Sequence, residues 1–111
     1  MRRLVLDPRG IPTGDERPFD GLDAELGESS FDDGFAMTDK PTSLSIAGGG
    51  RRITVDLLAG YPYAQIFAPK AHNYIALEPM TAPTSALTSG RGLRLVKPGE
   101  QLRAVFRIRI P

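Results

Sequence analysis

Apolar and polar residues alternate most regularly at the C-terminal end of the chain. From Gln101 to Ile110 every second side chain is apolar, and three of the residues between them are arginines. Arg52–Leu57 alternates in the same way. Because successive side chains of a β-strand point to opposite faces, both segments predict strands with one apolar face. We expect the arginine row to be the solvated outer face of an edge strand, where charge protects against aggregation.

Shorter segments rich in aromatic and β-branched residues predict further strands. These segments are Arg2–Leu6, Ser43–Ala47, Tyr63–Ala68, Tyr74–Leu77 and Gly92–Val96. The glycines at positions 48–50 follow one expected strand directly and precede another. They predict a tight turn, so Ser43–Ala47 and Arg52–Leu57 are expected to form a β-hairpin.

No segment of the chain shows a helical period, and the pattern therefore favours an all-β fold. Residues 7–30 are rich in glycine, proline and aspartate, and we expect them to form a long surface loop. Strands that each carry one apolar face predict an antiparallel β-sandwich. A chain of 111 residues with 41% apolar content fits one domain over residues 1–111. Such a domain has a radius of gyration of about 13 Å when compact.

Composition excludes several classes of protein. The formal net charge is +1, which gives no reason to expect a nucleic acid as partner. There are no cysteines, so disulfides and thiolate metal sites are excluded. With His72 as the only histidine, we expect no metal. No apolar run approaches the roughly 18–20 residues that span a bilayer, so we expect a cytoplasmic protein with no membrane partner.

Glu78 is the first candidate for chemistry. It follows the apolar segment Tyr74–Leu77 and precedes Pro79, which lacks an N–H group and is expected to end the strand. A carboxylate held partly buried at the mouth of an apolar strand is placed for acid–base chemistry. The alternative is a structural salt bridge, which also holds carboxylates at strand ends.

Asp32 is the second candidate. It lies with Asp33 between two phenylalanines in the segment Phe31–Phe35. Carboxylates that accept hydrogen bonds from hydroxyl groups, beside rings that cover C–H faces, are typical of sugar binding. An ordinary turn at Asp-Asp-Gly is the alternative.

Four segments together resemble the aldose 1-epimerase (mutarotase) family. Tyr74–Thr81, which reads YIALEPMT, is similar to the EPMT segment of that family. Pro12–Asp15 is similar to its PTGE segment, with aspartate in place of the usual glutamate. Phe31–Phe35 and the Pro-Gly-Glu turn at positions 98–100 also match, in the family's order. The resemblance implies the C-terminal portion of a galactose mutarotase-like supersandwich.

The resemblance also implies roles for the two candidates. Glu78 corresponds to the general base that opens and recloses the ring of a hexose or related sugar, and Asp32 to the residue that contacts the sugar hydroxyls. Asp33 lies where many relatives have histidine. No cofactor is implied, because only protons move. The family's catalytic acid, a histidine, lies in an N-terminal part with no counterpart here, and His72 matches neither of that part's two histidines.

Three hypotheses follow. The chain is an aldose 1-epimerase, with the acid supplied by a missing segment or a partner chain. Alternatively, it is a carbohydrate-binding module without catalysis, or a truncated structural fragment. Arg91 and Arg94, in the loop after Glu78, leave a phosphorylated sugar open as the substrate.

The apolar strand faces also predict assembly. In the family this part packs against an N-terminal half, and a single layer of strands cannot shield its own apolar face. We therefore expect a homo-oligomer, most simply a twofold dimer, or association with the missing N-terminal half.

Overall fold

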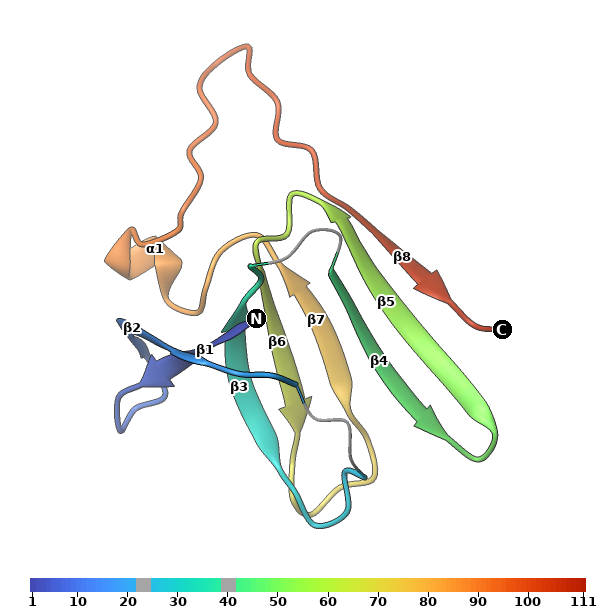
Figure 1. Ribbon diagram of the computed structural model, residues 1–111. Helices are drawn as coiled ribbons and strands as arrows, with labels where there is room; N and C mark the ends of the chain where they lie inside the picture. Colours follow the sequence, from blue (N-terminus) through green and yellow to red (C-terminus); the bar gives the residue numbers. More distant parts are fainter. Residues whose placement is uncertain (22–24, 39–41) are drawn as a thin grey trace.

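The computed structural model describes residues 1–21, 25–38 and 42–111, and these form two antiparallel sheets (Figure 1). The larger sheet has the order β2-β1-β3-β6-β7 and the smaller one the order β4-β5-β8. The strands are β1 (Arg2–Leu6), β2 (Pro12–Pro18), β3 (Phe31–Ala36), β4 (Thr42–Gly48), β5 (Arg51–Ala59), β6 (Tyr63–Ala68), β7 (Ala76–Met80) and β8 (Val105–Arg109). The chain is therefore mostly β, with an open arrangement of two sheets that is consistent with a β-sandwich.

The predicted hairpin is confirmed and its turn is well defined. Strands β4 and β5 pair from Thr42 opposite Leu57 to Gly48 opposite Arg51. The two residues between them, Gly49 and Gly50, have φ of 55° and 74°. Two successive positive φ angles are the requirement of a type I′ turn, which matches the right-handed twist of the flanking strands and favours glycine.

The expectation of a long loop over residues 7–30 is wrong in part, because β2 lies inside it. Strand β2 pairs with β1, with Leu4 opposite Glu16 and Leu6 opposite Pro12. Most of its side chains are exposed, since it is the outermost strand of its sheet. A polar edge strand is held by its backbone hydrogen bonds and shows no alternation in the sequence. Residues 22–24 of the expected loop lie outside the described part of the chain.

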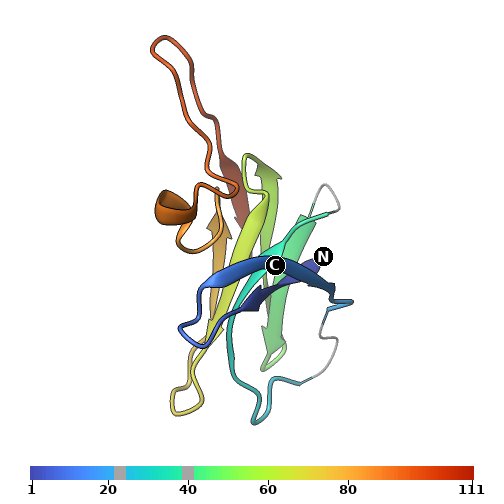
Figure 2. The same ribbon diagram turned by 90° about the vertical axis from the view of Figure 1, so that its left-hand side faces the viewer.

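Two predictions near the C-terminus need correction. Gly92–Val96 is not a strand, and the last strand covers only Val105–Arg109. Residues 90–104 instead form an irregular arm that projects from the body in both views (Figure 2). The radius of gyration is 14.9 Å, above the value of about 13 Å for a compact domain of this length, as the projecting arm requires.

A single helical turn, α1 (Ala86–Ser89), precedes the arm, although no helix was predicted. Gly90 ends it in the left-handed conformation, with φ of 73°, and donates its N–H to the Ala86 carbonyl. A segment of this length shows no period by which a sequence could predict it. Within the described residues no helix has the length and apolarity needed to cross a membrane.

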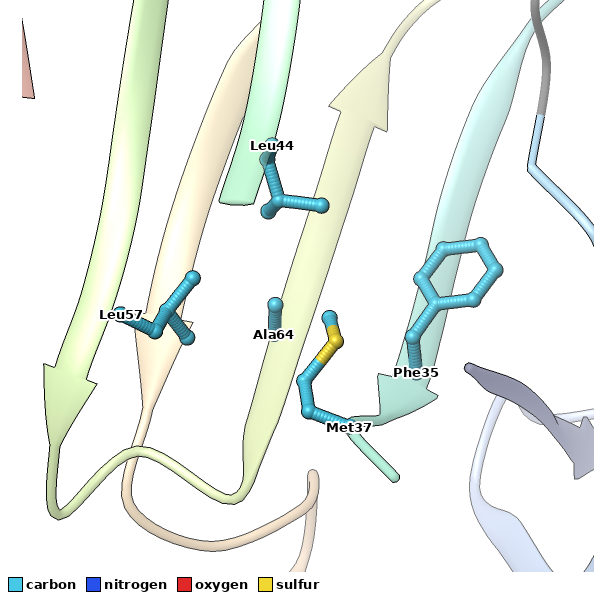
Figure 3. Close-up of a cluster of buried hydrophobic side chains, with 5 residues drawn as sticks. All are labelled: Phe35, Met37, Leu44, Leu57 and Ala64. Atoms are coloured by element: carbon cyan, nitrogen blue, oxygen red, sulfur yellow. The ribbon is translucent and has the colours of Figure 1, made fainter. Parts of the chain in front are cut away.

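The hydrophobic core lies between the two sheets (Figure 3). Phe35 and Ala64, from neighbouring strands of the larger sheet, are fully buried. Leu44 and Leu57 face them from the smaller sheet, and Met37 fills the space beside Phe35. Each of these strands therefore contributes one apolar face. The alternation in the sequence predicts this for β4, β5 and β6, whereas β3 was not predicted as a strand and the turn expected as an alternative at Asp-Asp-Gly is wrong.

Asp56 joins the three strands of the smaller sheet. Its side chain is only 5% exposed, although it lies on the face opposite the core. Arg109 donates two hydrogen bonds to it, at 2.7 and 3.0 Å, Arg107 donates one at 2.9 Å, and Ser43 Oγ donates one at 2.7 Å. The arginine row is therefore more than a solvated face, because two of its members pair with a buried carboxylate. Hydrogen bonds from Arg109 and Ser43 hold the pKa of Asp56 well below its ordinary value of 3.8, against the raising effect of burial.

The core predicts a first outcome. Phe35→Ala removes a fully buried ring and leaves a cavity, so the free energy of unfolding should fall by about 3–5 kcal/mol. Urea denaturation followed by circular dichroism measures the change. Ile110→Ala, at a side chain that is 69% exposed, is the matched control and should change stability little. Equal urea midpoints for the two variants would contradict this core.

The Asp56 cluster predicts a pH dependence. A carboxylate with a lowered pKa stabilises the folded state above its ordinary pKa, and this stabilisation is lost as the pH falls through the folded-state value. The stability of the wild type should therefore drop between about pH 5 and pH 2. Asp56→Asn should be less stable at neutral pH and show a shallower drop in urea titrations. Asp20→Asn controls for the loss of one negative charge, and a slope in Asp56→Asn equal to that of this control would refute the assignment.

Candidate functional site

Glu78 lies in the middle of β7 and not at a strand end. The strand begins at Ala76, two residues later than the start predicted for it, and continues through Pro79 to Met80. Pro79 pairs opposite Ala64 and does not end the ladder. Proline is tolerated there because β7 is an edge strand, where the nitrogen of a residue can face solvent. Glu78 is exposed, so the expected partial burial of this carboxylate is wrong for this chain.

Asp32 lies on β3 and has a defined partner. Its Oδ1 accepts a hydrogen bond of 2.8 Å from Nε2 of Gln65 on the neighbouring strand β6. Asp32 itself is exposed, so its second oxygen faces solvent-accessible space. The hydrogen bond orients the Asp32 carboxylate and also fixes which end of the Gln65 amide faces it.

The strand register brings both predicted residues to one face of the larger sheet. Gly34 lies opposite Gln65, and Gln65 lies opposite Glu78. Residues directly opposite one another in an antiparallel ladder project to the same face. Asp32 is two residues from Gly34 and shares that face. The amide of Gln65 therefore lies between the two carboxylates on adjacent strands.

Gln65 is the site residue that sequence reasoning missed. It shares a face with Tyr63 and Phe67, and that relation was visible in the alternation of the strand. The signal that was available is a lone amide in an otherwise apolar and aromatic strand. A polar side chain in a strand that packs against the core requires a hydrogen-bond partner, and for Gln65 this partner is Asp32.

The neighbours of Asp32 along the chain face the other way. Asp33 points to the opposite side of the sheet, where its Oδ1 binds NH2 of Arg3 at 2.7 Å. Phe35 lies on the same side as Asp33 and is buried in the core. The aromatic residues beside Asp32 in the sequence therefore do not cover a ligand at Asp32. Phe67 lies directly opposite Asp32 and is an aromatic residue on its face.

A hollow of about 180 Å³ adjoins Asp32 and is lined by residues from two of the segments singled out in the sequence. Pro12, from the PTGD segment, lines it together with Asp32, Gly34 and Gln65. Thr84, three residues after Thr81 of the EPMT segment, completes the wall. Glu78 is not among the residues that line this hollow. The hollow lies on the side of the sheet that carries both carboxylates.

Arg91 connects two segments beside the hollow, the loop after β7 and the start of β2. Its guanidinium donates hydrogen bonds to the backbone carbonyls of Pro12, at 3.3 Å, and of Thr13. The loop after the EPMT segment is thus bound to the PTGD segment. A guanidinium used in this way supports the wall of the site, which weakens the case for Arg91 as a phosphate ligand.

A second cation lies at the rim of the hollow. Arg9 lines it and is held by a 2.9 Å ion pair with Asp7. The pKa of Asp7 is lowered chiefly by a hydrogen bond from the Ile11 N–H. Burial acts in the opposite direction, and hydrogen bonds from the side chain and N–H of Arg9 lower the pKa further. Asp7 therefore remains ionised and keeps the Arg9 side chain close to the hollow. The rim therefore carries an Arg9–Asp7 ion pair near Asp32.

His72 lies at the tip of the hairpin formed by β6 and β7. Its ring is 5.5 Å from that of Tyr74, which in turn is 6.1 Å from the ring of Phe67. Ile75, at the base of that tip, is about 10 Å along the strand from Glu78 at 3.3 Å per residue. His72 lies beyond Ile75, so it is not placed opposite Glu78. The His72 ring therefore belongs to a row of aromatic rings with Tyr74 and Phe67, on the outside of the hairpin.

Among the residues that the structure describes, no three or more His, Cys, Asp or Glu side chains gather closely enough to hold a metal ion. A scan against models of protein families finds no match to this chain, and comparisons with curated proteins and with solved structures find no significant similarity. The site is therefore interpreted from its own geometry.

Gly34 predicts a test of this geometry. A Cβ at that position would lie 3.0 Å from Leu4 Cδ1 and 3.2 Å from Gln65 Oε1, so Gly34→Ala should displace the Gln65 amide and weaken its hydrogen bond to Asp32. The side-chain NH2 signals of Gln65 in a ¹⁵N NMR spectrum should shift. Gly48→Ala, which meets no atom within 4 Å, is the matched control. Unchanged Gln65 signals in Gly34→Ala would argue against this packing.

Proposed function

We propose that this chain is the sugar-binding and base-bearing part of an aldose 1-epimerase, with the fold of the C-terminal portion of a galactose mutarotase-like supersandwich. One observation carries the proposal. Asp32, Gln65 and Glu78 lie on one face of three adjacent strands, and Asp32 is oriented by a 2.8 Å hydrogen bond from Gln65. Two carboxylates and an amide in one row suit a ligand with several hydroxyl groups.

The hollow beside this row supports the same interpretation. Its lining includes residues from two of the four segments on which the resemblance to the family depends, Pro12 from the PTGD segment and Asp32 and Gly34 from Phe31–Phe35. These segments are far apart in the sequence, so their convergence is a property of the fold and not of local similarity. Phe67 on the Asp32 face offers an apolar surface for the C–H side of a sugar ring.

The chemistry assigned to Glu78 is proton transfer without a cofactor. Its carboxylate accepts the proton of the anomeric hydroxyl, the electron pair of that O–H bond forms the C1 carbonyl, and the C1–O5 bond breaks. A general acid gives a proton to O5. Rotation about C1–C2 and the reverse steps close the ring as the other anomer, and both protons return to their donors.

The general acid is the part of the mechanism for which the described residues offer no histidine close to Glu78. His72 lies at the hairpin tip, further from Glu78 than Ile75, which is itself about 10 Å along the strand from Glu78. We therefore assign the acid to a histidine outside these 111 residues, in another segment or in a partner chain. That source would also cover Glu78, which is exposed in this structure.

The exposure of Glu78 favours a second candidate function. A carbohydrate-binding module needs the row of polar side chains but neither a desolvated base nor an acid opposite it. In that case the chain binds the sugar through Asp32 and Gln65 and leaves its anomeric ratio unchanged.

A rescue experiment separates the two candidates. Fresh α-anomer of glucose or galactose is followed by polarimetry in imidazole buffer, in which imidazolium stands in for the absent acid. The wild type should accelerate the change above buffer alone. Glu78→Gln should lose this acceleration by about a hundredfold or more, because the general base is gone. Glu100→Gln, at an exposed turn, is the matched control.

Binding is measured in parallel by NMR titration. Asp32→Asn should weaken hexose binding by about ten- to a hundredfold, the effect of losing a hydrogen bond to a charged group. Glu78→Gln should still bind. Binding without acceleration by the wild type would select the binding module. No binding of any hexose by either the wild type or Asp32→Ala would leave a structural fragment and end the proposal.

A further inference from the structure

Strand β8 forms an outer edge of the smaller sheet. It pairs with β5 on one side, from Thr54 opposite Arg109 to Ala59 opposite Val105, and no other described strand pairs with it. In Figure 1 it lies at the outside of the molecule, beyond β5 and away from the larger sheet. Its outward N–H and C=O groups are therefore available to another strand.

One side of β8 is apolar and largely exposed, although the Phe106 ring packs against that of Tyr61 at 5.9 Å. Phe106, Ile108 and Ile110 alternate along it and are 46%, 56% and 69% exposed. Ile53, on the same side of the adjacent strand β5, is 42% exposed. Single exposed apolar residues are normal, but four on one side of two paired strands form a continuous apolar patch.

The other side of β8 is positively charged. Arg107 and Arg109 are 57% and 54% exposed although both bind Asp56. One carboxylate neutralises one of the two guanidinium groups, so a positive charge remains in excess on this side. Arg107 makes a single hydrogen bond to Asp56, which leaves most of its five N–H donors for another acceptor.

The β8 strand of a second copy of the chain is a poor fit to this edge. Antiparallel pairing of two β8 strands about Ile108 would place Arg107 of each copy directly opposite Arg109 of the other. Like charges directly opposite one another destabilise a strand pair. A shift of register by one residue would place arginines beside isoleucines, because the two sides of the strand would no longer match.

We propose that the β8 edge binds an extended peptide segment whose side chains alternate between acidic and apolar residues. Its backbone extends the smaller sheet, its apolar side chains cover Phe106, Ile108 and Ile110, and its carboxylates pair with Arg107 and Arg109. The inference does not depend on the proposed sugar chemistry, because no residue of β8 lies at the Asp32 hollow.

Fluorescence anisotropy with short labelled peptides tests the proposal. The wild type should bind a peptide of alternating valine and glutamate at least about tenfold more tightly than one of alternating valine and lysine, since like charges cost several kcal/mol at an interface. Added salt should weaken the acidic peptide's binding. A valine–glutamate peptide with alternate backbone nitrogens methylated should not bind, because it cannot form the ladder.

Variants connect the binding to β8. Arg107→Gln should weaken binding of the acidic peptide about threefold, the value of an exposed ion pair. It leaves Asp56 with both hydrogen bonds from Arg109, so the fold should persist. Arg94→Gln, in the projecting arm, is the matched control and should bind as the wild type does. If Arg107→Gln fails to fold by circular dichroism, the comparison of peptides on the wild type decides.

Three results would overturn the proposal. Equal affinity for the glutamate and lysine peptides would remove the charge recognition, and tight binding of the methylated peptide would remove the strand addition. A stable dimer in light scattering that Ile108→Glu converts to a monomer would give the edge to a second copy of the chain.

Discussion

The antiparallel register between β3, β6 and β7 is the constraint on which both the core and the candidate site depend. It sets Gly34, Gln65 and Glu78 in one row, and therefore sends Phe35 and Ala64 to the other side. A slip of one residue would exchange the two sides of a strand, so that the same change would expose Phe35 and bury Asp32. Burial of Phe35 thus holds the polar row in place, although none of the row's side chains belongs to the core.

The sequence predicts strands with a buried face where the alternation is regular, as in β5, but not in β3, where the pair Asp32-Asp33 interrupts the alternation. The alternation in Arg52–Leu57, together with the glycines that precede it, is enough to predict the β4–β5 hairpin, because both burial and turn geometry restrict which residue types occur. Strand β2 leaves no such trace, since an edge strand with exposed side chains is held by backbone hydrogen bonds that any residue but proline provides. The opposite error occurs near the C-terminus, where the alternation starts before the strand and the first residues expected in β8 lie in the arm.

The candidate site is predictable in its residues more than in its geometry. Asp32 and Glu78 are separated by more than forty residues, and the structure brings them to one face of one sheet. The predictions that are wrong or missing concern residues whose role depends on a neighbouring strand. Pro79 is a strand end only if the strand has partners on both sides, and Gln65 gains its role from a carboxylate on another strand. Asp56 likewise reads as an outward residue until the arginines of β8 are known to lie over it.

The distribution of proline gives the two sheets different resistance to uncontrolled growth. Both outer strands of the larger sheet contain proline, at Pro12 and Pro18 in β2 and at Pro79 in β7. A residue without an N–H interrupts the row of donors that an added strand would need, which is a common protection against aggregation. The outer strands of the smaller sheet, β4 and β8, contain none. Proline therefore obstructs strand addition at both edges of the larger sheet, whereas at the smaller sheet the backbone donors are uninterrupted and the arginines of β8 are the feature that opposes pairing with another copy.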